Sequence, residues 1–153
     1  MEKKNKLTVE KKSILKKLYD IYSGLWKLHL YFLSKIIWRF TYLCFNSSIP
    51  PTVVLEEGVN FGHPIGIVIH QNAIIGSNTI IYQNVTIGRR NGNKEESPII
   101  GKNCIIGAGA CVLGNIKIGN NVKIGANSVV VTDVPDNCTV VGIPGEIIKN
   151  GNK

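Results

Sequence analysis

The histidines are the first candidates for chemistry in this sequence, because imidazole titrates near neutral pH and can accept a proton from a hydroxyl group. His63 stands between a glycine and a proline, where a titratable ring could act as a base. It also lies six residues before Ile69, so a histidine packed in a core is the alternative. We expect a structural or solvent-facing role for His70 and no chemical role for His29.

Neither a metal site nor a cysteine nucleophile is expected. The cysteines show no C-x-x-C spacing, and together with the three histidines they match no zinc pattern. Cys104 falls at an inward position of a repeat, and Cys111 and Cys138 have no base beside them in the sequence. Any group transfer should therefore be direct, without a covalent enzyme intermediate.

The positive charge of the protein is concentrated in its N-terminal third. The 153 residues carry a net charge of +8, and residues 1–45 hold ten Lys and Arg against three acidic residues. The basic residues accompany an apolar segment and form no recognition motif, so nucleic-acid binding is not expected. The length allows one domain with a short appendage.

The basic segment is expected to be helical. Residues 25–45 are apolar enough to suggest a membrane span, but four basic or histidine side chains interrupt them, which disfavours spanning. From Ser13 the apolar spacing predicts an amphipathic helix. This helix either packs on the protein or a neighbouring subunit, or residues 1–45 adsorb to an anionic membrane. With no signal peptide visible, we expect a cytoplasmic protein, the alternative being peripheral attachment at the inner membrane face.

A six-residue repeat governs the rest of the chain. Aliphatic residues recur in phase at Ile69, Ile75, Ile81, Ile87, Ile100, Ile106, Val112, Ile118, Ile124 and Val130. Glycine commonly follows the aliphatic residue, and asparagine comes two residues after the glycine. Both residue types tolerate positive φ. The period therefore predicts strands alternating with tight corners, so that the chain coils.

One insertion interrupts the repeat. Ile87 and Ile100 are thirteen residues apart instead of a multiple of six, and residues 89–98 are polar and end at a proline. This segment must leave the coil as a loop, either as a substrate lid or as a tolerated surface insertion.

Five ordered motifs resemble the serine acetyltransferase-like branch of the hexapeptide-repeat acyltransferases. They are Phe61–Ile69, Tyr82–Gly88, Pro98–Gly101, Ile106–Ala110 and Leu113–Ile116. The resemblance implies a mainly β fold, a left-handed parallel β-helix over residues 48–148, between an N-terminal helical segment (1–47) and a C-terminal tail (149–153). It also implies homotrimers with sites between subunits.

The same resemblance implies O-acetyl transfer from acetyl-CoA, with His63 as the general base and no metal. Ala108 and Ala126 lie eighteen residues apart, so they should share one corner of successive coils and leave a groove for the donor. The expected donor residues are Gly88, Ala108, Ala126, Lys123 and Lys149. The expected acceptor residues are Asn84, Arg89, Arg90 and Ser97.

Three departures from that branch bear on the acceptor. Ser48, Gly62 and Ser97 stand where the branch has charged or titratable groups that orient the base or bind an amino acid. These departures favour a sugar hydroxyl, as in capsule, exopolysaccharide or lipopolysaccharide synthesis. Serine O-acetyl transfer in cysteine biosynthesis is the alternative within the same chemistry, and a noncatalytic β-helix scaffold is the alternative from another class.

Overall fold

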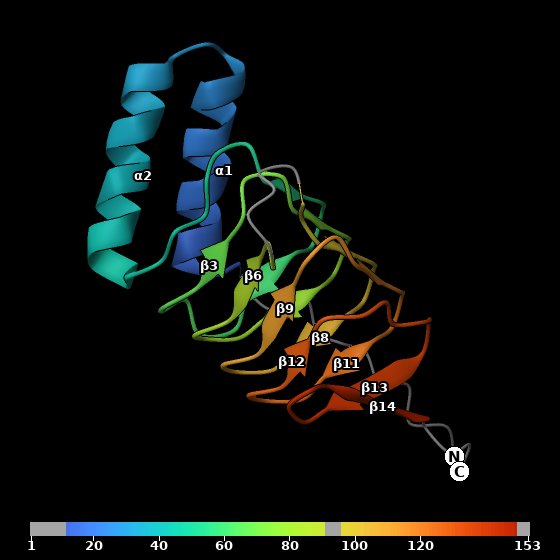
Figure 1. Cartoon of the computed structure of the whole chain (residues 1–153). Coiled ribbons are helices and arrows are strands. Elements are labelled where there is room, and N and C mark those ends of the chain that lie inside the picture. The colour runs from blue at the N-terminus through green and yellow to red at the C-terminus, as the bar shows by residue number, and fades with distance from the viewer. Residues whose placement is uncertain (1–11, 91–95, 150–153) are drawn as a thin grey trace, which may run out of the picture.

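Two helices precede the repeat, where the sequence indicated one helical segment. The computed structural model describes residues 12–90 and 96–149 (Figure 1). α1 (Ile14–Lys27) begins at Ser13, whose hydroxyl accepts a hydrogen bond from a backbone amide of the first turn. His29 has a left-handed backbone with φ of 61° and lies in the short turn before α2 (Tyr31–Phe45), so the helices form a hairpin.

The chain after the hairpin coils through three parallel sheets in turn, each forming one side of a triangular prism (Figure 1). The first sheet holds β1 (Val54–Leu55), β4 (Ile74–Ile75), β7 (Ile99–Ile100) and β10 (Lys117–Ile118). The second holds β2 (Asn60–Phe61), β5 (Ile80–Ile81), β8 (Ile105–Ile106), β11 (Lys123–Ile124), β13 (Cys138–Val141) and β14 (Glu146–Lys149). The third holds β3 (Val68–Ile69), β6 (Thr86–Gly88), β9 (Cys111–Leu113) and β12 (Val129–Val130). Only β14 is antiparallel to its neighbour among these described strands.

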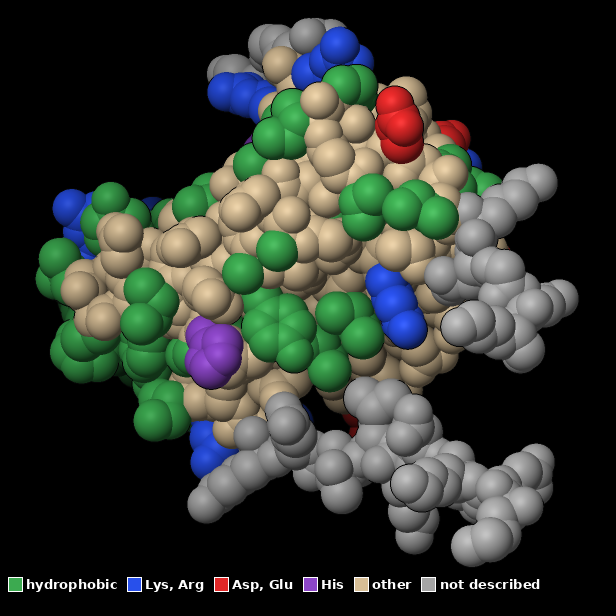
Figure 2. Space-filling model, turned by 90° about the horizontal axis from the view of Figure 1, so that it is seen from below, with side chains coloured by type: hydrophobic (Ala, Val, Ile, Leu, Met, Phe, Trp, Pro, Cys, Tyr) green, Lys and Arg blue, Asp and Glu red, His purple; other side chains and the backbone are tan. Residues whose placement is uncertain are grey.

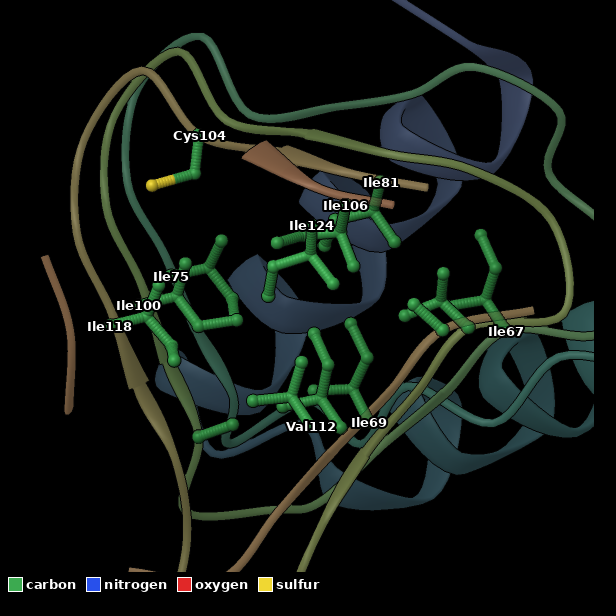
Figure 3. Close-up of a cluster of buried hydrophobic side chains, with 14 of the residues drawn as sticks. Ile67, Ile69, Ile75, Ile81, Ile100, Cys104, Ile106, Val112, Ile118 and Ile124 are labelled. Carbon is green, nitrogen blue, oxygen red and sulfur yellow. The ribbon is translucent and has the colours of Figure 1, made fainter. Parts of the chain in front are cut away.

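The core is a set of stacked aliphatic columns, one against each sheet. Ile81, Ile106 and Ile124 pair in register on the second sheet, and their side chains point into the prism (Figure 3). Each is at most 2% exposed, and burial of such a side chain stabilises the fold by about 1.5–3 kcal/mol. The aliphatic period in the sequence is therefore the period of the core, and the predicted left-handed β-helix is confirmed.

The corners use the residue types that the sequence indicated. Asn84 and Asn127 adopt left-handed backbone with φ of 57°, and the glycines of the neighbouring coils at this corner do the same. A Cβ on Gly109 would lie 2.1 Å from the Asn127 side-chain oxygen, so each asparagine covers a glycine of the coil before it. This close stacking leaves no room for a larger residue at Gly109.

The coils differ in length, and the differences matter for the site. Ile106 pairs with Ile124, eighteen residues later, whereas Phe61 pairs with Ile81, twenty residues later. Ile81 pairs with Ile106, twenty-five residues later, because the insertion after β6 adds seven residues. The extra residues leave the prism at corners and do not disturb the strand register.

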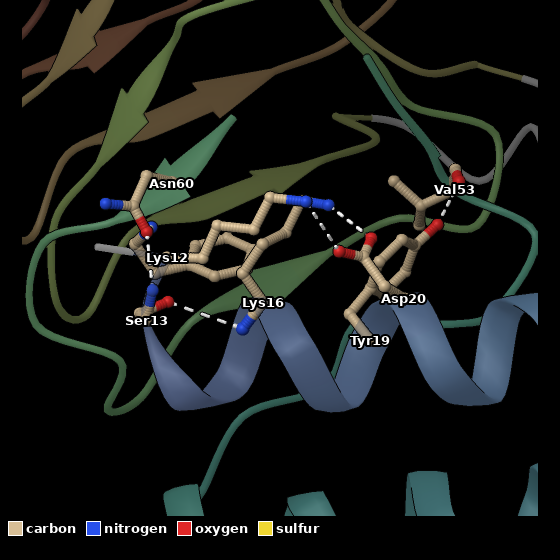
Figure 4. Close-up of polar contacts among 8 residues, drawn as sticks. Lys12, Ser13, Lys16, Tyr19, Asp20, Val53 and Asn60 are labelled. Atoms are coloured by element: carbon tan, nitrogen blue, oxygen red, sulfur yellow. Dashed lines mark hydrogen bonds and ion pairs between the residues drawn. The ribbon is translucent and has the colours of Figure 1, made fainter. Parts of the chain in front are cut away.

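Helix α1 attaches the hairpin to the first coil through polar and aromatic contacts (Figure 4). The hydroxyl of Tyr19 donates a hydrogen bond to the Val53 carbonyl, and Asn60 accepts one of 2.9 Å from the Ser13 amide. The hydroxyl of Tyr22 donates one of 2.7 Å to the Ile49 carbonyl. α1 thus packs against the β-helix, and within the described residues no helix is long and apolar enough to cross a bilayer.

Candidate functional site

His63 lies outside the core, on the corner between β2 and β3. This corner holds the two extra residues of the first coil, so Ile67 takes the inward position and is fully buried, whereas the His63 side chain is exposed. The six-residue spacing between His63 and Ile69 therefore does not place His63 in the core. The alternative of a packed core histidine is wrong, and the ring is accessible to a substrate.

The ring of Tyr82, from the next coil, lies beside His63. The two ring centroids are 6.1 Å apart with an interplanar angle of 47°. A Cβ on Gly62 would lie 2.7 Å from a carbon of the Tyr82 ring, so the tyrosine covers this glycine. Glycine at position 62 is thus required by packing. Tyr82 escaped the sequence analysis, although an aromatic residue at the usual glycine position of the repeat was a visible signal.

Ala108 and Ala126 share this corner with His63, as their spacing predicted. The Ala108 carbonyl accepts a hydrogen bond of 2.8 Å from the Asn127 amide, and the Gln83 carbonyl accepts one of 2.9 Å from the Gly109 amide. Ala108 is half-buried and Ala126 is exposed, so small side chains line the surface above Tyr82 and Gln83. Asn84 stands at the same corner and is exposed.

Gln83 is a second residue that the sequence analysis missed. Its side-chain oxygen is buried and has no hydrogen-bond partner among the described residues. A buried amide oxygen without a partner is costly, and a donor group brought to this corner would satisfy it. No signal in the repeat distinguished Gln83 from other corner residues.

The other predicted residues gather at a different corner, between β6 and β7. Gly88 ends β6, and the exposed side chains of Arg89 and Arg90 follow it. A Cβ on Gly114 would lie 3.4 Å from the Cβ of Arg90, so the start of the insertion runs along the next coil. Ser97 is 6% exposed, and its hydroxyl has no hydrogen-bond partner among the described residues. Residues 91–95 of the predicted loop lie outside the described part.

The two corners lie at opposite ends of the third sheet. His63 precedes β3 at the level of Gln83, and Gly88 ends the neighbouring strand β6. Gln83 and Asn84 form a turn, so strand geometry applies only from Val85 to Gly88, and at about 3.3 Å per residue this stretch spans about 10 Å. Within one protomer, His63 therefore belongs to a different corner from Arg89 and Arg90.

The predicted lysines differ in what the structure describes. Lys123 opens β11, three residues before Ala126, and its side chain is exposed on the outer face of the second sheet. Lys149 ends β14, where it pairs with Cys138, and its side chain lies outside the described residues. Lys123 is thus placed near the small-residue corner, whereas the contribution of Lys149 stays a prediction.

The cysteines do not form a reactive centre in the described residues. Burial raises the pKa of the Cys104 thiol, which disfavours the reactive thiolate. Cys138 is also buried, Cys111 is half-buried, and Cys44 is exposed on α2. No group of His, Cys, Asp and Glu side chains in the described ranges could hold a metal ion. The exposed imidazole of His63 is the better candidate for proton transfer.

Comparison with known proteins identifies the repeat. Residues 97–132 match the family model described as bacterial transferase hexapeptide (six repeats). This part of the chain therefore carries the hexapeptide repeat of a bacterial transferase family. The serine acetyltransferase of Synechococcus elongatus is 42% identical over 127 residues, which is 81% of this chain and 51% of that protein.

Solved structures agree with this family. The crystal structure of Neisseria gonorrhoeae serine acetyltransferase superposes with a TM-score of 0.82 at 36% identity, over 89% of this chain and 54% of that one. A serine acetyltransferase in complex with CoA gives 0.78 at 34% identity, over 86% and 54%. The chain thus spans about half the length of the relatives that it matches.

These relatives overturn the predicted sugar acceptor. Three relatives that are 40–42% identical to the chain are serine acetyltransferases, so the polysaccharide assignment drawn from Ser48, Gly62 and Ser97 is wrong. That argument treated three positions as the source of the charge needed for an amino acid. Packing against Tyr82 explains Gly62, and the exposed guanidinium groups of Arg89 and Arg90 offer positive charge elsewhere.

Proposed function

We propose that the protein transfers an acetyl group from acetyl-CoA to the hydroxyl of L-serine. The observation that carries this proposal is the alignment with serine acetyltransferases over 81% of the chain, a range in which His63 stands exposed beside Tyr82. An exposed imidazole is chemically suited to accept the proton of a hydroxyl group. A noncatalytic scaffold would give no reason for an unpaired imidazole on this corner.

The chemistry requires one proton acceptor. His63 takes the hydroxyl proton of serine while the serine oxygen attacks the thioester carbonyl. A carbon–oxygen bond forms, the carbon–sulfur bond breaks, and the CoA thiolate leaves with the proton returned by the imidazolium. A positioned base of this kind contributes about 10²- to 10⁴-fold to the rate. Attack is direct in a ternary complex, because the raised pKa of Cys104 disfavours a cysteine nucleophile.

The donor is proposed to lie along the small-residue corner. Ala108 and Ala126 leave the backbone accessible there, so an extended pantetheine arm can contact peptide groups. The thioester would lie near Gly88, which ends β6 at the corner between β6 and β7. Lys123, on the neighbouring outer face, and Lys149 would meet phosphate oxygens as point charges.

The acceptor is proposed to lie between His63, on the first corner, and the second corner, which joins β6 to β7. The guanidinium groups of Arg89 and Arg90 match the planar carboxylate of serine, which they can bind through paired hydrogen bonds. Asn84 and the unpartnered Ser97 hydroxyl supply neutral hydrogen-bonding groups at the two corners. The positive charge that binds the serine carboxylate then comes from Arg89 and Arg90.

The separation of the corners supports a homotrimer. Strand β6 separates the His63 corner from Gly88 within one protomer, and a neighbouring subunit that brought its second corner to His63 would complete the site. A rotationally symmetric ring of three would place the first corner of each subunit against the second corner of the next. We therefore propose three equivalent sites, each shared by two subunits.

The reaction is proposed to take place in the cytoplasm, where acetyl-CoA and free serine are both present. The unpaired state of the four cysteines is consistent with a reducing compartment. Attachment to the inner membrane face is compatible with this location. It would involve only the helical hairpin, which contains none of the proposed site residues.

His63→Ala tests the proposed base, and His70→Ala is its matched control. Release of CoA thiol in the presence of L-serine should fall about 10²- to 10⁴-fold in the first variant and stay near normal in the second. Acetyl-CoA affinity and oligomeric state should be unchanged in both. Near-normal turnover of His63→Ala would overturn the base assignment, and an active protein that does not acetylate serine would overturn the acceptor.

Subunit mixing tests whether the site is shared. His63→Ala and the double variant Arg89→Ala/Arg90→Ala should each be inactive alone. Unfolded and refolded together, they should recover activity, because some interfaces then combine an intact first corner with an intact second corner. Recovery is expected only for a shared site, so a mixture as inactive as its parents would rule out the intersubunit arrangement.

A further inference from the structure

Helix α2 has apolar side chains on both its inner and its outer side. On the inner side Ser34 and Thr41 are buried, and the half-buried side chains of Ile37, Trp38 and Phe45 pack against the core. The Ser34 hydroxyl donates a hydrogen bond of 2.7 Å to the Tyr22 carbonyl of α1. A helix on a water-exposed surface is normally polar on its outer side, and α2 departs from this pattern.

Five large apolar side chains form one exposed side of α2, which we call the α2 outer face. They are Phe32 (81% exposed), Leu43 (72%), Phe40 (55%), Ile36 (49%) and Leu33 (47%). Figure 2 shows hydrophobic side chains gathered at the end of the molecule that holds the hairpin in Figure 1. A contiguous exposed patch of this kind marks an interaction surface.

The charged side chains of α2 and of the segments that flank it in the sequence are all positive. Between Asp20 and Glu56 the sequence has no acidic residue, and Lys27, Lys35 and Arg39 are exposed in this stretch. Asp20 itself forms ion pairs with Lys12 and Lys16 on α1. A surface that combines large apolar side chains with cations alone is complementary to an apolar layer bordered by anions.

Pairing of the α2 outer face with the same face of a second copy fits this surface less well. If two α2 outer faces packed together, Lys35 and Arg39 would meet their own counterparts with no acidic side chain between them. Like charges brought together destabilise such an interface. An anionic bilayer has no such conflict, since its phosphates accept the cations while its acyl chains cover the apolar side chains.

We propose that the α2 outer face docks the protein on an anionic membrane surface. The helix lies in the interface instead of crossing it, because it has only 15 residues and carries Lys35 and Arg39. Each cation near an anionic leaflet contributes about 1 kcal/mol, in addition to burial of the apolar side chains. Trp26 is half-exposed in the last turn of α1, close to the turn that leads into α2, and a tryptophan suits the boundary between headgroups and acyl chains.

Vesicle binding of the full chain tests this proposal. The only tryptophans, Trp26 and Trp38, both lie in the hairpin, so intrinsic fluorescence reports that element alone. With vesicles of mixed phosphatidylglycerol and phosphatidylcholine, the protein should float with the lipid and its tryptophan emission should shift to shorter wavelength. Binding should decrease with salt and be much weaker to phosphatidylcholine alone. No flotation with the anionic vesicles at low salt would overturn the proposal.

Paired variants separate the α2 outer face from the rest of the protein surface as the cause of binding. Phe32→Ser/Phe40→Ser should lower vesicle affinity about tenfold or more, whereas Val54→Ser/Ile143→Ser, at exposed apolar sites of the β-helix, should leave it unchanged. Lys35→Glu/Arg39→Glu should weaken binding far more than Lys102→Glu/Lys117→Glu, which changes the net charge equally. Equal losses within either pair would contradict the proposal.

Two further readouts distinguish membrane docking from self-association and from loss of catalysis. Self-association that disappears in Phe32→Ser/Phe40→Ser, in a protein that binds no vesicles, would assign the face to a second copy and overturn membrane docking. His63→Ala should float like the natural protein, so failure of the proposed catalysis and failure of membrane docking are separate results.

Discussion

The β-helix and the helical hairpin bury apolar surface in opposite ways. In the β-helix the aliphatic columns point inward, and Ile81 and Ile106 are fully buried between sheets of the same chain. In the hairpin, α1 adds Leu15, Tyr19 and Tyr22 to this core, whereas α2 leaves five large apolar side chains of its outer face exposed. The β-helix thus leaves little of its aliphatic columns uncovered, but the hairpin has apolar surface available to another body.

The polar contacts of the two regions differ as well. The coils are joined by a continuous ladder of backbone hydrogen bonds, which any sequence of suitable corner residues can supply. The hairpin depends on individual side chains, among them the hydroxyls of Tyr19 and Tyr22 bonded to carbonyls of the first coil. Stability in the coil is therefore distributed, whereas attachment of the hairpin is concentrated in a few groups.

The largest expected effect contrasts isoleucines of the two regions. Ile106→Ala removes a buried side chain from a stacked column and should lower the free energy of unfolding by about 2–5 kcal/mol. Ile36→Ala, on the α2 outer face, should change it by no more than about 0.5 kcal/mol in the absence of lipid. Urea unfolding followed by circular dichroism measures both. A comparable cost at Ile36 would mean that the α2 outer face is covered in solution.

Alkaline pH should act first on the hairpin. Burial raises the pKa of Tyr19 and of Tyr22 above the ordinary 10.0. Because the folded chain keeps these protons to higher pH than the unfolded chain, their stabilisation is complete below pH 10 and is lost as the pH rises through the folded pKa values. Tryptophan fluorescence should therefore report loosening of the hairpin above pH about 10, before the β-helix unfolds.

Tyr22→Phe isolates one of the two phenols. It removes the hydrogen bond to the buried Ile49 carbonyl and should cost about 1–3 kcal/mol at neutral pH. It should also make the alkaline loosening less steep, since one titrating group is lost. An unchanged alkaline transition in Tyr19→Phe/Tyr22→Phe would show that other groups control the hairpin.

The smallest effects should have opposite signs in the two regions. Gly109→Ala forces a side chain into a left-handed corner with φ of 69°, against Asn127, and should destabilise by about 1–2 kcal/mol. Gly24→Ala lies in α1 with open space around the added Cβ and should stabilise by about 0.5–1 kcal/mol. Thermal melts of both variants check the contrast. Destabilisation by Gly24→Ala would indicate that the space around Gly24 is filled in solution.

The positions of some candidate site residues were predictable from the sequence, but the arrangement of the others was not. The eighteen-residue spacing of Ala108 and Ala126 placed them on one corner, because the repeat converts sequence distance directly into position along the coil. The same arithmetic put His63 in the core phase, since the two extra residues of the first coil become visible only when Phe61 pairs with Ile81. Tyr82 and Gln83 were missed because their roles arise between coils.

The acceptor shows a second limit of prediction from single positions. Missing charges at Ser48, Gly62 and Ser97 were taken to favour a sugar over an amino acid, and the serine acetyltransferase relatives contradict this. Glycine at 62 is set by the ring of Tyr82, which belongs to another coil. Replacement of one group reveals little about a site until the residues that surround it are known.

The sequence alone determined the coil, its corners and the basic helical segment. These features follow from local rules, since aliphatic spacing selects strand faces and the backbone preferences of glycine and asparagine select corners. The tertiary structure decided that His63 is exposed, that the two groups of site residues lie at opposite ends of one sheet, and that α2 leaves one of its apolar sides exposed. Each of these depends on which distant segments pack together: the pairing of Phe61 with Ile81, and the contact of Ser34 with α1. Such contacts depend on the shapes of both partners, so no periodicity within either segment encodes them.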